Sequence, residues 1–134
     1  MMPHLILYTD GAAWGNPGPA AVAVVIRDES GRVLREIARS IGRATNNQAE
    51  YRALILGLEE AAKLGTAYLE VRMDSELIVR QLNGRYRVKN AALQALFKRA
   101  SELLTKFPSV TIVHIPRQAN QRADALAKAA LAAR

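Results

Sequence analysis

The sequence predicts an α/β domain built on a mixed sheet, antiparallel on one side and parallel on the other. Apolar, β-rich segments come first and follow one another directly, at 4–13 and within 20–42, whereas helix-like and strand-like segments alternate from residue 45 onward. Consecutive strands pair as hairpins, and strands separated by a helix pair in parallel. A chain of 134 residues suffices for one core but not comfortably for two, so we expect a single domain over residues 1–134.

The first part of the chain is expected to form three strands. Residues 4–13, HLILYTDGAA, have the apolar character of a central strand, and the sequence NPGP interrupts the chain soon after them. Residues 20–42 contain two apolar stretches around the turn sequence DESG, which is typical of an antiparallel hairpin.

The second part is expected to alternate helices and strands. Apolar residues recur at helical spacing between Thr45 and Gly65, where glycine ends the segment. The segments that follow are a strand at 68–73, a short helix at 75–84, a longer helix at 90–107, a strand at 110–115 and an alanine-rich helix at 119–133.

Composition excludes several classes of chemistry and location. The chain has no cysteine, which rules out disulfides, thiolate metal sites and thiol catalysis. Half of the residues are hydrophobic and 23% are charged, as in soluble globular proteins. No apolar run approaches the roughly 20 residues that span a bilayer, and the N-terminus lacks the pattern of a signal peptide. We therefore expect a cytoplasmic protein with no membrane partner.

The net charge of +7 favours a polyanionic partner, with nucleic acid ahead of an acidic membrane surface. Between Leu77 and Ser101 there are six bases and no acid, and Tyr86 lies between two of these arginines. The six are Arg80, Arg85, Arg87, Lys89, Lys98 and Arg99. A solvated helix face usually mixes both signs, so this cluster favours contact with phosphates.

Four acidic residues lie at the edges of apolar segments, each in a different predicted element. They are Asp10, Glu50, Asp74 and Asp124. Glu50 heads the same helical stripe as Leu54 and Leu58, so its side chain should point toward the sheet. Acids that converge repel one another unless they take up protons or bind cations. Oxygen ligands suit Mg²⁺ or Mn²⁺ rather than Zn²⁺, and two such ions about 3.5 to 4 Å apart can hydrolyse a phosphodiester.

Each acid also has a plainer interpretation, and the pattern alone leaves both open. Asp74 precedes a predicted helix and is compatible with a cap. Asp124 is compatible with an exposed position on its helix, and Glu50 with a contribution to the helix dipole. Asp10 is the hardest to explain in this way, although the pair Asp–Gly also occurs in turns.

Five segments together resemble type 1 ribonuclease H, in their order and over nearly the whole chain. They are YTDGAAWGNPGPAA, TNNQAEYRAL, RMDSELIVRQLNG, YRVKN and HIPRQANQRADALA. The resemblance implies a five-stranded mixed sheet, with three antiparallel strands and then two parallel ones, flanked by helices on both faces. It also implies endonucleolytic cleavage of the RNA strand of RNA–DNA hybrids that leaves 5′-phosphate and 3′-hydroxyl ends.

The resemblance further implies which residues act. Asp10, Glu50, Asp74 and Asp124 correspond to catalytic ligands of two Mg²⁺ or Mn²⁺ ions, which bind with the substrate. A second group corresponds to substrate contacts, in part near the ribose 2′-hydroxyl that distinguishes RNA from DNA. These are Gly11, Ala12, Ala13, Asn16, Thr45, Asn46, Asn47, Lys89 and Asn90. For Thr45 and the asparagines the plainer interpretation is helix capping and turn formation.

Two departures from the family pattern affect the expectations. The mobile loop histidine of many bacterial members is missing, because His114 falls inside the fifth predicted strand, where we expect it to be packed. Arg117 is the residue expected to act instead, by contacting a phosphate or assisting product release; it cannot be a general base. The second departure concerns the basic protrusion of many members, since RQLNGRYRVKN leads almost directly into the next helix. Arg85, Tyr86, Arg87 and Lys89 offer a smaller substitute, in which Tyr86 either stacks on a sugar or packs under the arginines; packing is what we expect of a lone tyrosine.

The expected function is therefore an active ribonuclease H of the short form that lacks the basic protrusion, binding RNA–DNA hybrid as a monomer. Two alternatives stay open. The missing protrusion predicts weaker discrimination, so that double-stranded RNA could also be cleaved. A catalytically silent nucleic-acid-binding module on the same fold is the other alternative, although intact carboxylates hinder the binding of a polyanion.

Overall fold

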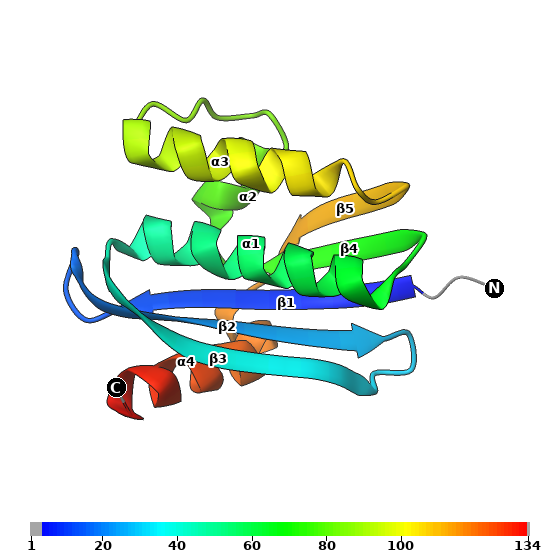
Figure 1. Cartoon of the computed structure of the whole chain (residues 1–134), viewed down its shortest axis with the longest axis horizontal. Coiled ribbons are helices and arrows are strands. Elements are labelled where there is room, and N and C mark those ends of the chain that lie inside the picture. Colours follow the sequence, from blue (N-terminus) through cyan, green and yellow to red (C-terminus); the bar gives the residue numbers. More distant parts are fainter. Residues whose placement is uncertain (1–3, 134) are drawn as a thin grey trace.

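The computed structural model describes residues 4–133, which form one five-stranded sheet with helices on both of its faces (Figure 1). The strands are β1 (His4–Ala13), β2 (Gly18–Asp28), β3 (Val33–Ala44), β4 (Tyr68–Met73) and β5 (Ser109–His114). The helices are α1 (Asn46–Leu64), α2 (Glu76–Leu82), α3 (Ala91–Leu104) and α4 (Gln121–Ala133), and a short 3₁₀ helix, η1 (Arg117–Asn120), precedes α4.

The sheet has the strand order β3-β2-β1-β4-β5. β1 and β3 both pair with β2 in antiparallel fashion, β4 pairs with β1 in parallel, and β5 pairs with β4 in parallel. The predicted mixed sheet is thereby confirmed. The hairpin between β2 and β3 closes as expected, because the Asp28 carboxylate accepts hydrogen bonds from the backbone N–H groups of Ser30 and Arg32.

The two faces of the sheet bury different kinds of side chain. On the face of α1, large apolar residues such as Leu5, Leu54 and Met73 form the main core, to which α3 also contributes. On the opposite face α4 packs through the small residues Ala123 and Ala127 against β2. Figure 1 shows α1 and α3 together on one side, with α4 behind the sheet.

Helix α1 follows the predicted stripe. Glu50, Leu54 and Leu58 are all buried against the sheet. The helix begins at a capping box, in which the Thr45 hydroxyl accepts from the Gln48 N–H and the Gln48 side chain accepts from the Thr45 N–H. It ends before Gly65, whose φ of 77° favours glycine.

Other boundaries differ from the prediction for local reasons. The helix expected at 75–84 ends at Leu82, and the positive φ of Gly84 belongs to the turn after it. In the segment expected as one helix at 119–133, the first two residues belong to η1 and α4 starts at Gln121. The packed position expected for His114 is wrong: this residue ends the edge strand β5 with an exposed side chain. Within residues 4–133, no helix combines the length and apolar character needed to cross a bilayer.

Candidate active site

The candidate site lies where β1 and β4 end on the same edge of the sheet. The parallel pairing of these strands continues to Tyr8 opposite Arg72. Asp10 follows two residues later on β1, and Asp74 comes directly after the last residue of β4. The first turns of α1 pass over this edge and contribute Glu50. Residues far apart in the sequence therefore meet because parallel strands end together.

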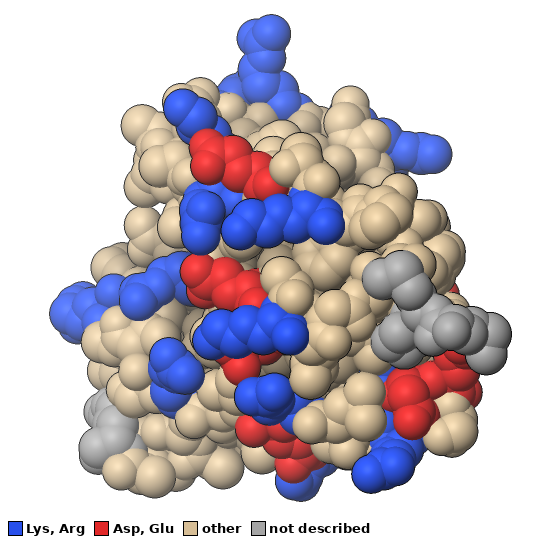
Figure 2. Space-filling model, turned by 45° about the vertical axis from the view of Figure 1, so that its right-hand side comes forward, with Lys and Arg blue, Asp and Glu red and all other residues tan. Residues whose placement is uncertain are grey.

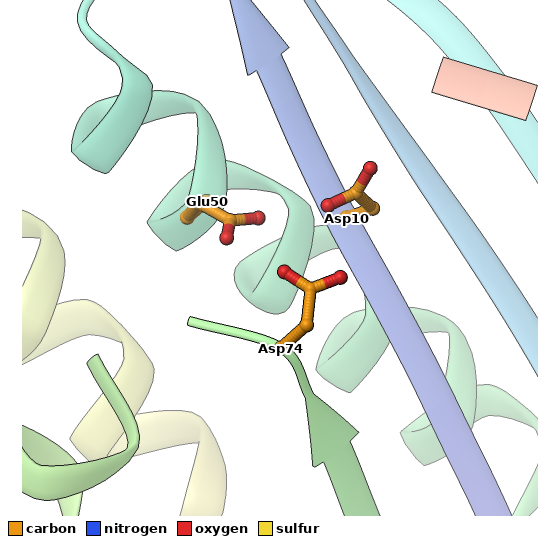
Figure 3. A group of neighbouring side chains, drawn as sticks. All are labelled: Asp10, Glu50 and Asp74. Carbon is orange, nitrogen blue, oxygen red and sulfur yellow. The ribbon is translucent and has the colours of Figure 1, made fainter. Parts of the chain in front are cut away.

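The three carboxylates point toward a common centre (Figure 3). One oxygen each from Asp10, Glu50 and Asp74 lies within 4.8 Å of the others. Asp10 and Glu50 are only 5% and 8% exposed, and Asp74 is partly buried. Such an arrangement is a candidate cation site, since buried charges of one sign need a compensating charge.

A glycine allows β1 and α1 to approach closely at this point. A Cβ on Gly11 would lie 2.2 Å from the carbonyl carbon of Ala49 and 2.4 Å from the backbone nitrogen of Glu50. Because no side chain fits there, the Gly11 N–H reaches the Glu50 carboxylate and donates a hydrogen bond of 2.6 Å to Oε1. The backbone of β1 thus fixes one of the three acids.

The site disfavours negative charge when cations are lacking. Burial, followed by the charges of Asp74 and Asp124, raises the pKa of Asp10 to about 8. Burial and the neighbouring Asp10 also raise the pKa of Glu50 well above its ordinary value. Arg117 offsets a part of both effects. A divalent cation bound by carboxylate oxygens would relieve this repulsion, so the residues present fit Mg²⁺ or Mn²⁺.

Asp124 lies next to the other acids but does not join them within the 4.8 Å group. It lines the same pocket, of about 380 Å³, from the first turn of α4. Its two oxygens face cations, since Oδ2 is 3.0 Å from Lys128 Nζ and Oδ1 is 3.9 Å from Arg117 Nη2. The sequence therefore predicted the neighbourhood of Asp124 but not its pairing.

Most of the predicted substrate contacts surround this pocket. Five of them line it: Gly11, Ala12, Ala13, Asn46 and Asn47. Asn16 is connected to the same region, because its side-chain oxygen accepts a hydrogen bond of 3.0 Å from the Asn46 N–H. Thr45 precedes these residues as the cap of α1. Arg117 also lines the pocket, and its side chain is 76% exposed.

The last two predicted contacts belong to a different segment of the chain, between α2 and α3. Lys89 and Asn90 are exposed residues between α2 and α3, and neither lines the carboxylate pocket. Asn90 caps α3 by accepting a hydrogen bond of 3.1 Å from the Leu93 N–H. Helix capping, the plainer interpretation of both residues, thus accounts for the observed contacts of Asn90 and Thr45.

The basic cluster of residues 77–101 is divided by ion pairs. Arg80 pairs with Glu76 at 3.1 Å, and Arg99 pairs with Glu59 on α1 at 3.3 Å. Figure 2 shows a face on which basic and acidic side chains lie next to one another and form no continuous basic patch. Within residues 4–133, four bases of the cluster take part in no ion pair: Arg85, Arg87, Lys89 and Lys98.

Tyr86 differs in part from its expected role. Its ring is near Arg80, whose guanidinium carbon lies 5.5 Å from the ring centroid, but the residue is 48% exposed. It is therefore a half-exposed partner of one arginine and is not packed beneath several. The flanking Arg85 and Arg87 are themselves exposed.

Sequence reasoning missed two residues of this region. Asn120 is buried and donates a hydrogen bond to Asp74, and Lys128 pairs with Asp124. Both are spaced by four residues from Asp124, a spacing that indicates one helix face. That spacing was the available signal.

Comparisons with known proteins agree with this geometry. The family model described as reverse transcriptase-like matches residues 8–130. A ribonuclease HI of Halobacterium salinarum is 51% identical over 92% of this chain, which spans 62% of the length of that relative.

Two solved structures share the fold over nearly their full length. The crystal structure of RNase H1 from Halobacterium salinarum has a TM-score of 0.95 and 48% identity, with 98% of this chain and 99% of that chain covered. LC11-RNase H1 in complex with RNA/DNA hybrid has a TM-score of 0.90 and 48% identity, with 96% of each chain covered. With this sequence similarity, this fold and a carboxylate cluster at the sheet edge, the chain belongs to the ribonuclease H family.

Proposed function

We propose that this protein is a metal-dependent endonuclease that hydrolyses the RNA strand of RNA–DNA hybrids, acting as a monomer with a single ribonuclease H domain. One observation carries the proposal: oxygens of Asp10, Glu50 and Asp74 converge within 4.8 Å in a pocket open to solvent. Such a cluster costs free energy unless cations compensate it. The hybrid-bound LC11-RNase H1, at 48% identity, supports the choice of substrate.

The proposed metal ligands are Asp10, Glu50, Asp74 and Asp124, for two ions of Mg²⁺ or Mn²⁺. When bound with substrate, such ions supply an activated water and stabilise the leaving 3′-oxygen, which yields 5′-phosphate and 3′-hydroxyl ends. The chain itself holds the acids in place. The Gly11 N–H orients Glu50, and the ion pair with Lys128 keeps Asp124 beside the pocket until a stronger cation competes.

The backbone of residues 11–13 is proposed to contact the ribose of the RNA strand. Gly11, Ala12 and Ala13 have no bulky side chain, so a minor groove can approach their backbone, with Glu50 beside it. The 2′-hydroxyl both donates and accepts hydrogen bonds, and it is the group that separates RNA from DNA. Asn46 and Asn47, in the same lining, are proposed to contact the bases or sugars.

The N-terminus of α1 is proposed to hold a phosphate of the DNA strand. The Thr45 hydroxyl accepts one hydrogen bond from Gln48 and keeps its own hydrogen available for a phosphate oxygen. Asn16, through its hydrogen bond to Asn46, keeps the preceding loop next to this helix end. The partial positive charge of a helix N-terminus favours the same anion.

The bases outside ion pairs are proposed to extend the contact with the hybrid. Lys89, Arg85 and Arg87 would contact phosphates. The side-chain oxygen of Asn90 caps α3, so Asn90 would contact the substrate next to them through its amide N–H groups. Arg117, whose Nη2 lies 3.9 Å from Asp124 Oδ1, is also proposed to contact a phosphate or assist product release.

Cleavage of matched end-labelled duplexes tests the proposal. RNA–DNA, RNA–RNA and DNA–DNA duplexes of one sequence are incubated with Mg²⁺, Mn²⁺ or EDTA. We expect cleavage of the RNA strand in the hybrid, and its loss with EDTA and in Asp10→Asn. Asp28→Asn is the matched control, because its remaining side-chain oxygen can still accept the hydrogen bonds of the β2–β3 turn.

Each other result points to a specific revision. Cleavage of the RNA–RNA duplex at a similar rate would favour the relaxed specificity predicted from the missing protrusion. Hybrid binding with no cleavage under any metal condition would refute the enzymatic proposal and favour a silent binding module.

A further inference from the structure

We infer that Asn120 is a positioning residue that orients Asp74 from behind the site and thereby sets the affinity for divalent cations. The inference deepens the proposed function and rests on it for its link to catalysis. Asn120 does not line the carboxylate pocket, so it would act through Asp74 and not on the substrate.

The side chain of Asn120 connects two of the elements that carry the acids. It lies at the end of η1 and is only 1% exposed. Its amide nitrogen donates to Asp74 Oδ2 at 2.9 Å and to the carbonyl oxygen of Thr9 at 3.0 Å. An amide has two N–H groups, and both are used here.

These two acceptors fix the orientation of the amide. If the group were turned over, its oxygen would face the Thr9 carbonyl and the Asp74 carboxylate, both of which only accept hydrogen bonds. The observed orientation leaves Asn120 Oδ1 buried without a hydrogen-bond partner among residues 4–133. Since an unpaired buried oxygen is unfavourable, the two donated bonds must determine the position.

The consequence for Asp74 is directional. Its Oδ2 is held by Asn120, so the rotation of the carboxylate is restricted and Oδ1 remains available to the pocket. Thr9 precedes Asp10 on β1, and Asn120 leads directly into the helix that carries Asp124. One buried amide therefore connects the three segments that carry Asp10, Asp74 and Asp124. Groups that orient metal ligands in this way typically change metal affinity or activity by about 10 to 100-fold when mutated.

Two substitutions at Asn120 and one control separate positioning from plain structural support. Asn120→Ala removes the amide, and Asn120→Leu replaces it with an apolar side chain of the same branched shape. Asn83→Ala is the control, because Asn83 also donates from its amide to a backbone carbonyl, that of Ile112 at 3.2 Å, but, unlike Asn120, it makes no hydrogen bond to an acid of the cluster. Circular dichroism identifies the folded variants, and the leucine variant serves if the alanine variant does not fold.

The first measurement is calorimetric titration of each protein with MnCl₂ without nucleic acid. We expect the Asn120 variants to bind Mn²⁺ at least about 10-fold more weakly than the wild type, and Asn83→Ala to bind it equally well. The second measurement is cleavage of the hybrid at a Mn²⁺ concentration near the dissociation constant of the wild type, where kcat should fall and the KM for the hybrid should stay within about two-fold, because Asn120 does not reach the substrate.

The outcomes distinguish this inference from the proposed function. Wild-type affinity for Mn²⁺ in a folded Asn120 variant would overturn the inference even if the protein cleaves hybrid. A loss of Mn²⁺ affinity confined to the Asn120 variants would support it even if the wild type cleaves no duplex, and would then leave only the proposed activity refuted.

Discussion

Removal of one charge from the carboxylate cluster should stabilise the metal-free protein at high pH. The pKa of Asp10 rises from its ordinary 3.8 to about 8 in the folded chain, through burial and the charges of Asp74 and Asp124. Between these pH values the folded protein keeps a proton that the unfolded chain has lost, so the free energy of unfolding falls as pH rises. At about 1.4 kcal/mol per pKa unit, a shift of roughly four units corresponds to about 6 kcal/mol as an upper limit. Because the acids titrate together, we expect Asp10→Asn to gain a few kcal/mol over the wild type above pH 8.

Urea unfolding in EDTA, at several pH values from 4.5 to 9 and constant ionic strength, measures this difference. The wild type should lose stability relative to Asp10→Asn across that range. Addition of Mg²⁺ should then stabilise the wild type more than the variant, by about 2.7 kcal/mol when the ion is present at 100 times its dissociation constant.

Asp28→Asn serves as a control, because its effect on stability should depend on pH in the opposite direction. The hydrogen bond from the Ser30 side chain, followed by those from backbone N–H groups, lowers the pKa of Asp28. Its contribution to stability is therefore present above the unfolded pKa and is lost as the pH falls through the folded one. Asp28→Asn should be less stable than the wild type at pH 7, and the difference should shrink in acid. Parallel pH profiles for the wild type and Asp10→Asn would refute the reasoning, because they would mean that Asp10 ionises as it does in the unfolded chain.

Two further predictions concern the elements that hold the acids. Gly11→Ala should lower the free energy of unfolding by about 1 to 3 kcal/mol, because the new Cβ would lie 2.2 Å from the Ala49 backbone. Gly57→Ala is the control: its Cβ would lie 2.8 Å from the flexible end of the Leu7 side chain, so the loss of stability should be smaller. Urea unfolding of both variants checks this, and a larger loss in Gly57→Ala would contradict it. Lys128→Ala should lower the Mg²⁺ concentration needed for half-maximal cleavage by about two-fold, because an exposed i,i+4 pair contributes about 0.3 to 0.5 kcal/mol. Lys63→Ala, which removes a comparable pair with Glu60 outside the carboxylate pocket, should leave that concentration unchanged. If Lys128→Ala needs more Mg²⁺ than the wild type, the prediction is wrong and Lys128 instead assists substrate binding.

The sequence predicted a mixed sheet, antiparallel on one side and parallel on the other, and it placed four acids at the edges of apolar segments. The strand order and the convergence of three of these acids come from the structure. Helical spacing identified Glu50 as a residue facing the sheet, and the parallel connection between the strands of Asp10 and Asp74 brought their ends together. These features follow from periodicity and topology, which local sequence reports directly.

The remaining features depend on contacts between distant segments. The pairing of Arg99 with Glu59 joins α3 to α1, and no pattern within residues 77–101 reveals it. The contacts of Asn120 depend on a 3₁₀ turn where the sequence suggested a regular helix. The exposure of His114 depends on β5 being the edge of the sheet, which a single apolar strand sequence does not disclose.

The unequal cores on the two faces of the sheet predict that α4 opens more readily than α1. Its apolar contacts with β2 involve alanines such as Ala123 and Ala127, which contribute less transfer free energy than the leucines and methionine under α1. Backbone amides of α4 should therefore exchange with deuterium through a local opening that leaves the rest of the sheet intact. Since this helix carries Asp124 and follows Asn120, each opening would separate both residues from the sheet, and a bound cation would slow the exchange by linking the helix to β1.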